Sequence, residues 1–441
     1  MPRWPGVRGH PLGGRAVSVD DCGTAVDHLW IIPASGVTAM TVLEDPMAVF
    51  AFCALICALV FWVSSQSWAE RFFKIVPSII LVYFLPTLAS TWGLIPSDSP
   101  TYDWMRDYLL PFSLFVLMIT TDVTAILRIG PRAIAIMLFG TAGVVVGGPL
   151  VLLLLGPWLP PEAWKGLAAL SGSWIGGGGN FAAIKESVGA PDSIIGPIII
   201  VDTVIAYTWM GVLLFLANYQ ARIDRWNNAS SAVLEDLNRR LRQFQEEQLR
   251  PMTLADVSMV LAIGFVGAVL CQHLSAWLYE ITQQALLQRA PNVASIFSSF
   301  TWLVILVSSL GILLSFTPLR RIERAGASKF GYAALYLFLT SIGAQADLAG
   351  ILAAPVLLLA GIVWMLCHVA FLVIGARLLK APLFLVAVGS QANIGGAASA
   401  PIVAAAYYES MAPVGLLMGV LGYLLGNYAG LLCAYLLRIV G

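Results

Sequence analysis

The chain has 441 residues, of which 59% are apolar and 11% are charged, and its formal net charge at pH 7 is zero. Soluble domains carry about 25% charged residues, and one soluble core of this length could not enclose so much apolar surface. The composition therefore excludes a soluble globular protein and predicts a membrane protein that lipid surrounds. The balanced charge gives no electrostatic basis for a nucleic-acid partner.

The first 45 residues differ from the rest of the chain because they combine three arginines, at positions 3, 8 and 15, with many Gly and Pro residues. No clean apolar run follows these arginines, which argues against a secretory signal peptide. We expect residues 1–45 to be disordered, or to result from a start codon placed upstream of the true one at Met40 or Met47.

Ten apolar runs after this segment approach the 20 residues that a helix needs to cross a bilayer. Two further apolar runs, 164–186 and 383–406, are interrupted by Gly and polar residues. The fold class predicted from these runs is all-α, with about ten transmembrane helices and two interrupted segments. The ten runs are 46–64, 76–94, 108–127, 132–156, 193–217, 254–276, 293–317, 330–346, 352–376 and 412–438.

The basic loop 218–252 decides how the interrupted runs are interpreted. If every run crosses the membrane, this loop faces the side opposite to the basic loops at 71–74 and 128–132, against the rule that basic loops face the cytoplasm. If both interrupted runs re-enter and return to the side that they entered, all these basic loops share one face. We favour the second model, with ten spans and both termini outside, and keep twelve crossing segments as the alternative.

The same loop carries an amphipathic pattern. Its apolar residues Leu234, Leu237, Leu241 and Phe244 recur at steps of three and four residues, with Glu, Arg and Gln between them. This pattern predicts that the linker 218–253 contains an amphipathic helix lying on the cytoplasmic surface of the bilayer.

The two halves of the chain resemble each other in sequence. The segment 121–127 aligns with 346–352, and the Gly-Ser and Ile-Gly-Gly pieces of 172–177 recur within 389–396. Five spans, an odd number, separate equivalent elements in the re-entrant model, so 46–217 and 254–441 are predicted to form an inverted five-plus-five repeat. Inverted repeats with interrupted segments are typical of secondary transporters, whose sites lie where the interruptions meet.

The two Gly-rich segments supply the candidate solute site. Each Gly costs about 1 kcal/mol relative to Ala in a helix interior, so four in succession favour broken backbone, which offers carbonyls to a cation and N–H groups to an anion. The alternative is structural: small residues allow close helix packing, and amide side chains satisfy backbone groups that the break releases. The candidate residues are Ser171, Ser173, Gly176, Gly177, Gly178, Gly179, Asn180, Ser390, Gln391, Asn393, Gly395, Gly396 and Ser399.

Asp202 is the strongest candidate for binding Na⁺ or exchanging a proton. It lies about nine residues into its run, near the bilayer centre, where a carboxylate costs about 2.5–3.5 kcal/mol on insertion scales. An intramembrane ion pair is the competing role, although the spans offer almost no cation. Asn427, Asp122 and Asp347 complete the ion-coupling candidates, with interhelical hydrogen bonding and helix capping as their structural alternatives.

At these residues the chain resembles the YjcL-like family, integral membrane proteins of bacteria and plastids known as a domain of unknown function. The resemblance covers about residues 47–441. In plan the chain is more distantly similar to the sodium/glutamate symporters, the 2-hydroxycarboxylate carriers and the bile-acid/sodium symporters. The resemblance implies a scaffold bundle and a transport bundle that moves against it.

The first two of these carrier families have Gly-Gly-x-Gly in paired re-entrant segments. Residues 176–179 fit that motif, whereas Gly395-Gly396 is followed by Ala397-Ala398. This departure weakens any transfer of substrate specificity from those carriers to this chain.

The sequence therefore predicts a secondary active transporter, not an enzyme, that moves a small anionic organic solute coupled to Na⁺ or H⁺. The expected location is the plasma (inner) membrane if the protein is bacterial. The scattered cysteines indicate no metal site beyond Na⁺, and no G-x-x-x-x-G-K-[ST] motif indicates ATP-driven transport. The alternatives are a cation/proton exchanger without an organic substrate and an intramembrane enzyme, and the sequence leaves a homodimer open.

Overall fold

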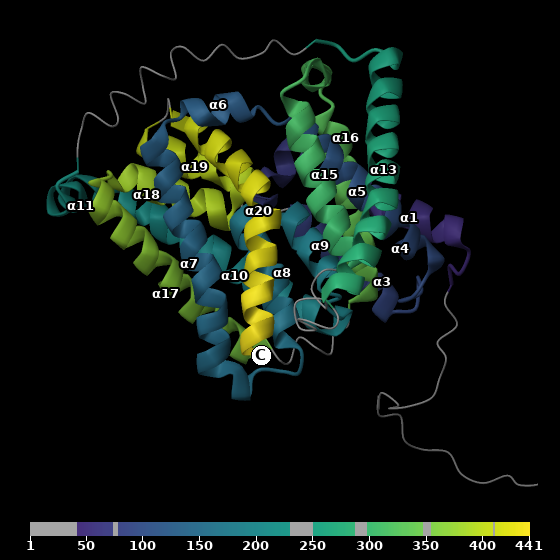
Figure 1. The fold of residues 1–441 in the computed structure, drawn as a ribbon, viewed down its shortest axis with the longest axis horizontal. Coiled ribbons are helices and arrows are strands. Elements are labelled where there is room, and N and C mark those ends of the chain that lie inside the picture. The colour runs from purple at the N-terminus through teal and green to yellow at the C-terminus, as the bar shows by residue number, and fades with distance from the viewer. Residues whose placement is uncertain (1–41, 74–77, 230–249, 287–297, 347–353, 409–410) are drawn as a thin grey trace, which may run out of the picture. The chain divides into compact units, whose positions relative to one another are not determined.

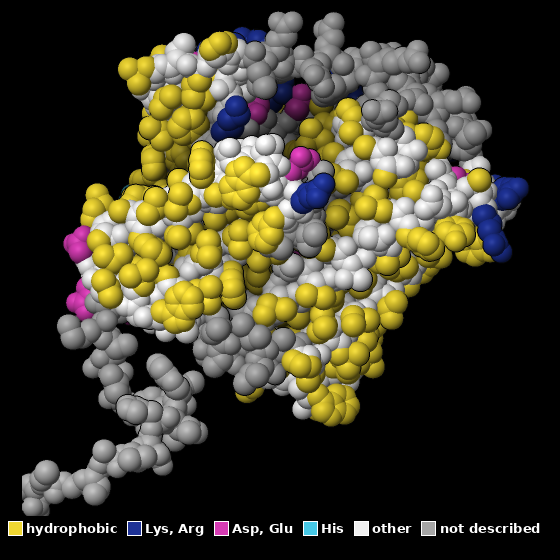
Figure 2. Space-filling view, turned by 180° about the vertical axis from the view of Figure 1, so that it is seen from behind, with side chains coloured by type: hydrophobic (Ala, Val, Ile, Leu, Met, Phe, Trp, Pro, Cys, Tyr) yellow, Lys and Arg dark blue, Asp and Glu magenta, His cyan; other side chains and the backbone are white. Residues whose placement is uncertain are grey.

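The structure, a computed structural model, describes residues 42–73, 78–229, 250–286, 298–346, 354–408 and 411–441. These residues form helices joined by turns, with no β-strand among them. Figure 2 shows one face, on which the described side chains are mostly hydrophobic and few are charged. Because such a surface is stable only when lipid covers it, the chain is an all-α, multi-pass integral membrane protein, as its composition predicts.

Six of the described helices are long and apolar enough to cross a membrane. A bent pair, Ser299–Ser315 with Pro318–Ala325, would make a seventh span. The six are Pro46–Ser64, Pro131–Trp158, Asp192–Ala217, Leu254–Gln284, Pro355–Leu379 and Ala412–Val440.

The first half of the chain contains helices α1 to α10. The helix α1 begins where the Asp45 carboxylate accepts a hydrogen bond from the Ala48 N–H at 2.8 Å, with Pro46 at the first helical position, where a missing N–H costs nothing. The bounds are α1 Pro46–Ser64, α2 Glu70–Phe73, α3 Ser78–Thr91, α4 Pro100–Trp104, α5 Leu110–Thr120, α6 Val123–Arg128, α7 Pro131–Leu155, α8 Ala163–Gly176, α9 Gly178–Ser187 and α10 Asp192–Ala217.

The second half follows the same order of long helices. Between the halves lies the short helix α11, Gln220–Asn227. The bounds are α13 Leu254–Leu286, α15 Ser299–Ser315, the 3₁₀ helix η4 Pro318–Ala325, α16 Ser328–Gln345, α17 Ala354–Leu379, α18 Leu383–Ile394, α19 Gly396–Tyr407 and α20 Ala412–Val440.

The long helices pack as two bundles (Figure 1). The α16 bundle contains α1, α3, α5, α13, α15 and α16, and the hairpin bundle contains α7 to α10 and α17 to α20. In the α16 bundle, α3 of the first half packs on α16 of the second half, and α15 of the second half packs on α5 of the first half. In the hairpin bundle, α7 of the first half packs along α17 of the second half. Helices at equivalent places in the two halves thus pack against each other's counterparts, and the inverted repeat of ten spans stays a prediction.

The predicted span 108–127 is wrong in its bounds. A continuous helical stretch runs from Pro100 through a π-helical turn, Met105–Leu109, to Thr120. The chain then turns extended at Thr121 (φ −69°, ψ 128°) and Asp122 caps the separate helix α6. The charged residues before position 108 hide the start of the helix from a hydropathy pattern, and the apolar residues of α6 extend its apparent end.

Two predicted segments lie largely outside the described residues. Of the predicted N-terminal extension 1–45, the structure describes only the last four residues, where the Val42 and Leu43 N–H groups donate to the Gly93 and Leu94 carbonyls, each at 3.0 Å. The predicted amphipathic pattern of the linker falls in 230–249, which is also outside them.

Helix α11, in the first described part of the linker, is attached near the start of α18. The Asp224 carboxylate accepts a hydrogen bond from the Leu383 N–H at 2.7 Å, and the Asn227 amide donates to the carbonyls of Ala376 and Ala381 at 3.1 and 2.7 Å. The hairpin bundle therefore holds α11.

The topology yields a direct prediction. In a cysteine-free background, a cysteine replacing Arg222 in α11 should react with a membrane-impermeant maleimide only from the cytoplasmic side. A cysteine replacing Glu162, between α7 and α8, should react only from outside, because α7 separates it from the basic loop near residue 130. Labelling of both positions from the same side would favour the model with twelve crossing segments and contradict the inverted orientation of the two halves.

Candidate functional site

The first Gly-rich segment folds as a helical hairpin. Helix α8 ends at Gly177, which has φ 78° and ψ −169°, a backbone conformation that favours glycine, and α9 starts at the next residue. A Cβ on Gly172 would lie 2.6 Å from the Asn180 carbonyl oxygen and 3.0 Å from a methylene carbon of Ile184. In a continuous helix these residues would be about 12 and 18 Å away, so the chain reverses direction at Gly177.

The second Gly-rich segment also reverses. Helix α18 ends at Gly395 and α19 begins at Gly396, which has φ 60°. The Gln391 side-chain amide donates to the Ser399 hydroxyl at 2.7 Å, although eight residues separate them. Chain reversal is the geometry that a re-entrant segment requires, and both interrupted runs have it. We call α8–α9 hairpin 1 and α18–α19 hairpin 2.

Helix α20 provides a smooth surface for both hairpins. A row of glycines at steps of three and four residues runs along one face: Gly415, Gly419, Gly422, Gly426 and Gly430. Side chains added at the last two positions would collide with hairpin 1, and side chains added at the first two would collide with hairpin 2. The hairpins therefore cover different stretches of α20 and approach its middle from opposite ends.

The two hairpins meet at Gly422. A Cβ on this residue would lie 2.6 Å from the Ile175 carbonyl oxygen of hairpin 1 and 3.2 Å from the Ala392 carbonyl oxygen of hairpin 2. Only a residue without a side chain lets both backbones come so close. The meeting point of the two interruptions is thus fixed at one turn of α20.

The ring of Tyr423 lies beside both glycine turns. A Cβ on Gly177 and a Cβ on Gly396 would each lie 3.3 Å from the same ring carbon, Cε1. The Ala397 backbone N–H at the start of α19 and the Tyr332 hydroxyl of α16 both lie near the Tyr423 hydroxyl. This tyrosine connects both hairpin turns with the α16 bundle.

Polar contacts of hairpin 1 continue across α20. The Asn180 amide donates to the Asn427 side-chain oxygen at 2.8 Å and to the Tyr423 carbonyl at 3.2 Å. The Asn427 amide in turn donates to the Ser308 hydroxyl of α15 at 2.7 Å. Asn180 and Asn427, predicted for different roles, thus belong to one hydrogen-bonded chain that joins the two bundles.

Asp202 of α10 faces hairpin 1 just before its turn. One carboxylate oxygen accepts the Ser173 hydroxyl at 2.7 Å, and the other accepts the Trp174 indole N–H at 2.9 Å. Within the described part of the chain, no Lys or Arg forms a salt bridge with it. Both donors to the carboxylate are neutral, and one of them, Ser173, is another predicted site residue.

The polar side chains of hairpin 2 mostly attach it to its own bundle. Ser390 Oγ lies 2.8 Å from the Trp209 indole nitrogen and 2.8 Å from His368 Nε2. The Asn393 amide donates to the Met137 carbonyl of α7 at 3.0 Å, and its oxygen accepts from a threonine of α7 at 3.0 Å. These contacts fit the structural alternative, in which Ser390 and Asn393 form hydrogen bonds within the protein and do not bind a solute.

Gln391 differs from these neighbours. Its side chain is 1% exposed, and its carbonyl oxygen has no hydrogen-bond partner although it is fully buried. A buried amide oxygen without a partner costs about 1–3 kcal/mol. Gln391 and Ser399 therefore leave one acceptor inside hairpin 2 available to a bound group.

The remaining predicted residues lie apart from the hairpin turns. Ser171 donates to the Ala168 carbonyl within α8 at 2.7 Å. The Asp122 carboxylate accepts from the Ala125 N–H at 2.9 Å, which is a helix cap, and lies 2.8 Å from the Arg320 guanidinium. Asp347, its counterpart in the repeat, lies outside the described residues.

Two cavities lie where the hairpin turns face α16, and they share Tyr332, Tyr336 and Tyr423. The smaller, about 60 Å³, is lined on one side by the glycines at 176, 178 and 179 and by Asn180. The larger, about 510 Å³, is lined by Ala397 and Ala398 of hairpin 2 and reaches Lys329. The glycine turns thus border space between the two bundles.

The α16 side of these cavities is formed by residues that were not among the predicted site residues. Lys329, Tyr332 and Tyr336 follow one another at steps of three and four residues, so they share one helix face. The signal was present, because a Lys-Tyr-Tyr stripe is unusual in an apolar span. Tyrosines at helical spacing are also common in packed cores, so the stripe alone does not identify a site.

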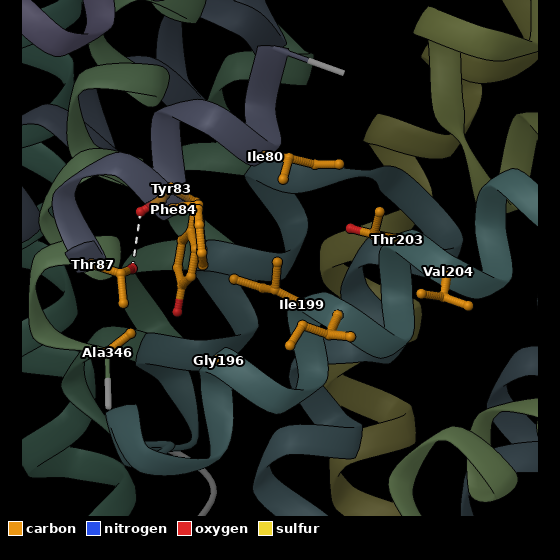
Figure 3. Close-up of a pocket in the computed structure, with 10 residues that line it drawn as sticks. Ile80, Tyr83, Phe84, Thr87, Gly196, Ile199, Thr203, Val204 and Ala346 are labelled. Atoms are coloured by element: carbon orange, nitrogen blue, oxygen red, sulfur yellow. Dashed lines mark hydrogen bonds between the residues drawn. The ribbon is translucent and has the colours of Figure 1, made fainter. Parts of the chain in front are cut away.

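A third cavity, about 140 Å³, lies between α3 and α10 (Figure 3). Its lining is apolar except for Thr87, Thr203 and Tyr83, and the Tyr83 hydroxyl is buried without a hydrogen-bond partner. None of the predicted site residues lines this cavity.

Comparison with known proteins gives two findings. Residues 51–440 match the model of the family described as "Protein of unknown function (DUF819)". The chain is also 26% identical over 348 residues to the "Uncharacterized membrane protein YjcL" of Bacillus subtilis (strain 168), covering 77% of this chain and 84% of that protein. The resemblance stated from the sequence is thereby confirmed.

The close contact at Gly422 leads to a stability prediction. Replacement of Gly422 by Ala should lower the thermal unfolding temperature, since overpacking against two backbones costs about 1–3 kcal/mol. The matched control is Gly211→Ala in α10, where an added Cβ meets nothing within 4 Å. Equal unfolding temperatures for Gly422→Ala and wild type in detergent would show that the hairpins do not close on α20.

The ion pair at Asp122 leads to a pH prediction. Partial burial works against ionisation, but hydrogen bonds from Thr124 and Ala125 and the charge of Arg320 outweigh it and hold the pKa of Asp122 below its usual value. A lowered pKa stabilises the fold above the unfolded-state pKa of about 3.9 and loses this contribution as the pH falls through the folded-state value.

Asp122→Asn keeps a capping oxygen and removes the charge. Its unfolding temperature should therefore be lower than that of wild type at pH 7, and the difference should shrink steadily below pH 4. A difference that is independent of pH from 7 to 3 would contradict a role for the charge.

Proposed function

We propose a transport function for this chain, which belongs to the family described as "Protein of unknown function (DUF819)". In this proposal the protein is a secondary active transporter, located in the plasma (inner) membrane if the protein is bacterial. It moves a small anionic organic solute, and Na⁺ or H⁺ supplies the driving force. No enzymatic step forms part of the proposal.

The observation that carries the proposal is the meeting of the two hairpins at Gly422. One hairpin comes from each half of the chain, and they reach this residue from opposite ends of α20. Interrupted helices that meet between inverted repeats are the arrangement in which secondary transporters bind their solutes. A packed membrane bundle without a ligand does not require two broken helices at the same place.

The second helices of the hairpins favour an anionic solute. The first turns of α9 and α19 carry N–H groups without intrahelical partners, and both border the cavities beside Tyr423. Unpaired N–H groups in the first turn of a helix are ready donors to an anion. The solute in this proposal therefore places its negative charge in a cavity that the hairpin turns border.

Asp202 is the proposed site of ion coupling. Its carboxylate touches hairpin 1 through Ser173 and Trp174 and lines none of the three cavities described above. Binding of Na⁺, or protonation, would change the hydrogen bonds that fix the α8 end of the turn. The ion would then bias the position of hairpin 1 without contacting the solute, which is a form of linkage.

The same separation supports the second candidate, a cation/proton exchanger without an organic substrate. Asp202 lines neither of the cavities beside Tyr423, so it could take up Na⁺ or H⁺ with no second ligand. Vesicle flux distinguishes the two functions, because an exchanger moves Na⁺ against H⁺ in the absence of any organic anion.

The coupling role of Asp202 is tested with purified protein and proteoliposomes. Anions that raise the unfolding temperature are identified first, in Na⁺ and in K⁺ buffers, because a bound ligand stabilises by mass action. Uptake of such an anion is then driven by a Na⁺ gradient or a pH gradient. Asp202→Asn should abolish gradient-driven uptake, because the neutral amide neither binds a proton nor attracts Na⁺.

Asp103→Asn, at a side chain that is 62% exposed, serves as the matched control and should leave uptake unchanged. Gradient-dependent uptake of normal rate in Asp202→Asn would refute the assignment of Asp202. If no anion is taken up and Na⁺ exchanges for H⁺ in its absence, the exchanger replaces the symporter.

A further inference from the structure

The larger of the two cavities beside Tyr423 has its own chemical character. It measures about 510 Å³, within the range of pockets that enclose organic ligands. Helices α1 and α16 form one wall, and α19 and α20 of the hairpin bundle form the other. A ligand that fills it would contact both bundles at once.

Aromatic rings dominate the α16 side of this cavity. Phe61 and Tyr336 meet edge to face, with ring centroids 4.8 Å apart and an interplanar angle of 62°. Tyr332 continues the row, with its ring 6.4 Å from that of Tyr336 and tilted by 31°. Together with Tyr423 on the opposite side, these rings offer flat apolar faces on which a planar group can stack.

One cationic side chain, that of Lys329, lies at the edge of the aromatic row. Lys329 lies one turn before Tyr332 on the same face of α16, and its side chain is exposed. The nearby acid Glu323 accepts hydrogen bonds from the Ser328 N–H and hydroxyl at 2.9 and 2.8 Å. Among the described residues, no carboxylate forms a salt bridge with Lys329.

This combination of aromatic rings and one lysine points to a substrate class. We infer that the cavity between α16 and hairpin 2 binds an aromatic monocarboxylate, with the ring stacked along Tyr332 and Tyr336 and the carboxylate at Lys329. A small polycarboxylate would leave the aromatic wall uncovered and place extra negative charge where only one cation lines the cavity. The inference rests on the proposed transport of an organic anion and specifies that solute.

The test compares three probes by isothermal titration calorimetry on the full chain in detergent. The probes are 3-phenylpropanoate, its neutral amide 3-phenylpropanamide, and succinate. The acid should bind about tenfold more tightly than the amide, since a hydrogen bond to a charged group contributes about 1.5–3 kcal/mol and 1.4 kcal/mol is one factor of ten. Succinate should bind more weakly than the aromatic acid.

Variants locate the binding energy within the cavity. Lys329→Gln should weaken binding of the acid about tenfold and leave binding of the amide unchanged. Tyr336→Leu keeps an apolar side chain but removes the ring, and should weaken both aromatic probes about fivefold. The control Lys380→Gln changes another exposed lysine, which does not line the cavity, and should have no effect.

The inference is overturned if the acid does not bind wild type, if acid and amide bind equally, or if Lys329→Gln binds the acid like wild type. Gradient-driven uptake in proteoliposomes separates this result from the fate of the proposed function. Uptake of succinate without binding of the aromatic acid would leave a transporter with a different substrate. Binding of the acid at Lys329 without uptake of any anion would support the inferred binding site and contradict the transport function.

Discussion

Backbone N–H and C=O groups that leave a helix inside a bilayer find no water, so a broken helix is stable only where protein surrounds it. In the described part of the chain, the Gly-rich segments are broken in this way at Gly177 and at Gly395-Gly396. Helix α20 meets both with a row of glycines, which lets the hairpin backbones approach within van der Waals contact. Most contacts of the candidate site follow from this approach, because it places both turns beside Tyr423.

The same approach divides the molecule into parts with different tasks. The hairpins and α20 are packed by small residues and leave little space between them, whereas larger spaces occur where they face α16. Side chains of the hairpin bundle hold the broken segments in place, as Asn393 does on α7. Side chains of the α16 bundle, such as Tyr332 and Tyr336, instead face the spaces beside the turns.

Several features were predictable because they depend on local chemistry. Consecutive glycines at 176–179 indicated broken backbone, and Asp122 before an apolar run indicated a helix cap, which the structure shows. The facing of individual side chains was not predictable, because it depends on tertiary packing. Ser171 and Ser173 are two residues apart, yet one bonds within α8 and the other reaches Asp202.

The predicted span 108–127 failed for a related reason. Hydropathy sums residues without regard to backbone direction, so it merged α5 with α6 across the extended turn at Thr121. The contact of Tyr423 with two hairpins that are distant in sequence could not be predicted from the sequence either. A pairwise repeat shows which segments are equivalent, and only the folded chain shows that both close on one helix.

The chain passes between the two bundles at three places, and these differ in length. One passage lies in the linker between α11 and α13. The other two passages are short, 121–130 and 346–353, and each contains one of the repeated aspartates. At the passage that the structure describes, 121–130, a rotation of one bundle against the other would be absorbed by a few backbone torsions, such as those at Thr121 and Asp122. The ion pair between Asp122 and Arg320 would then resist movement of the backbone at this passage.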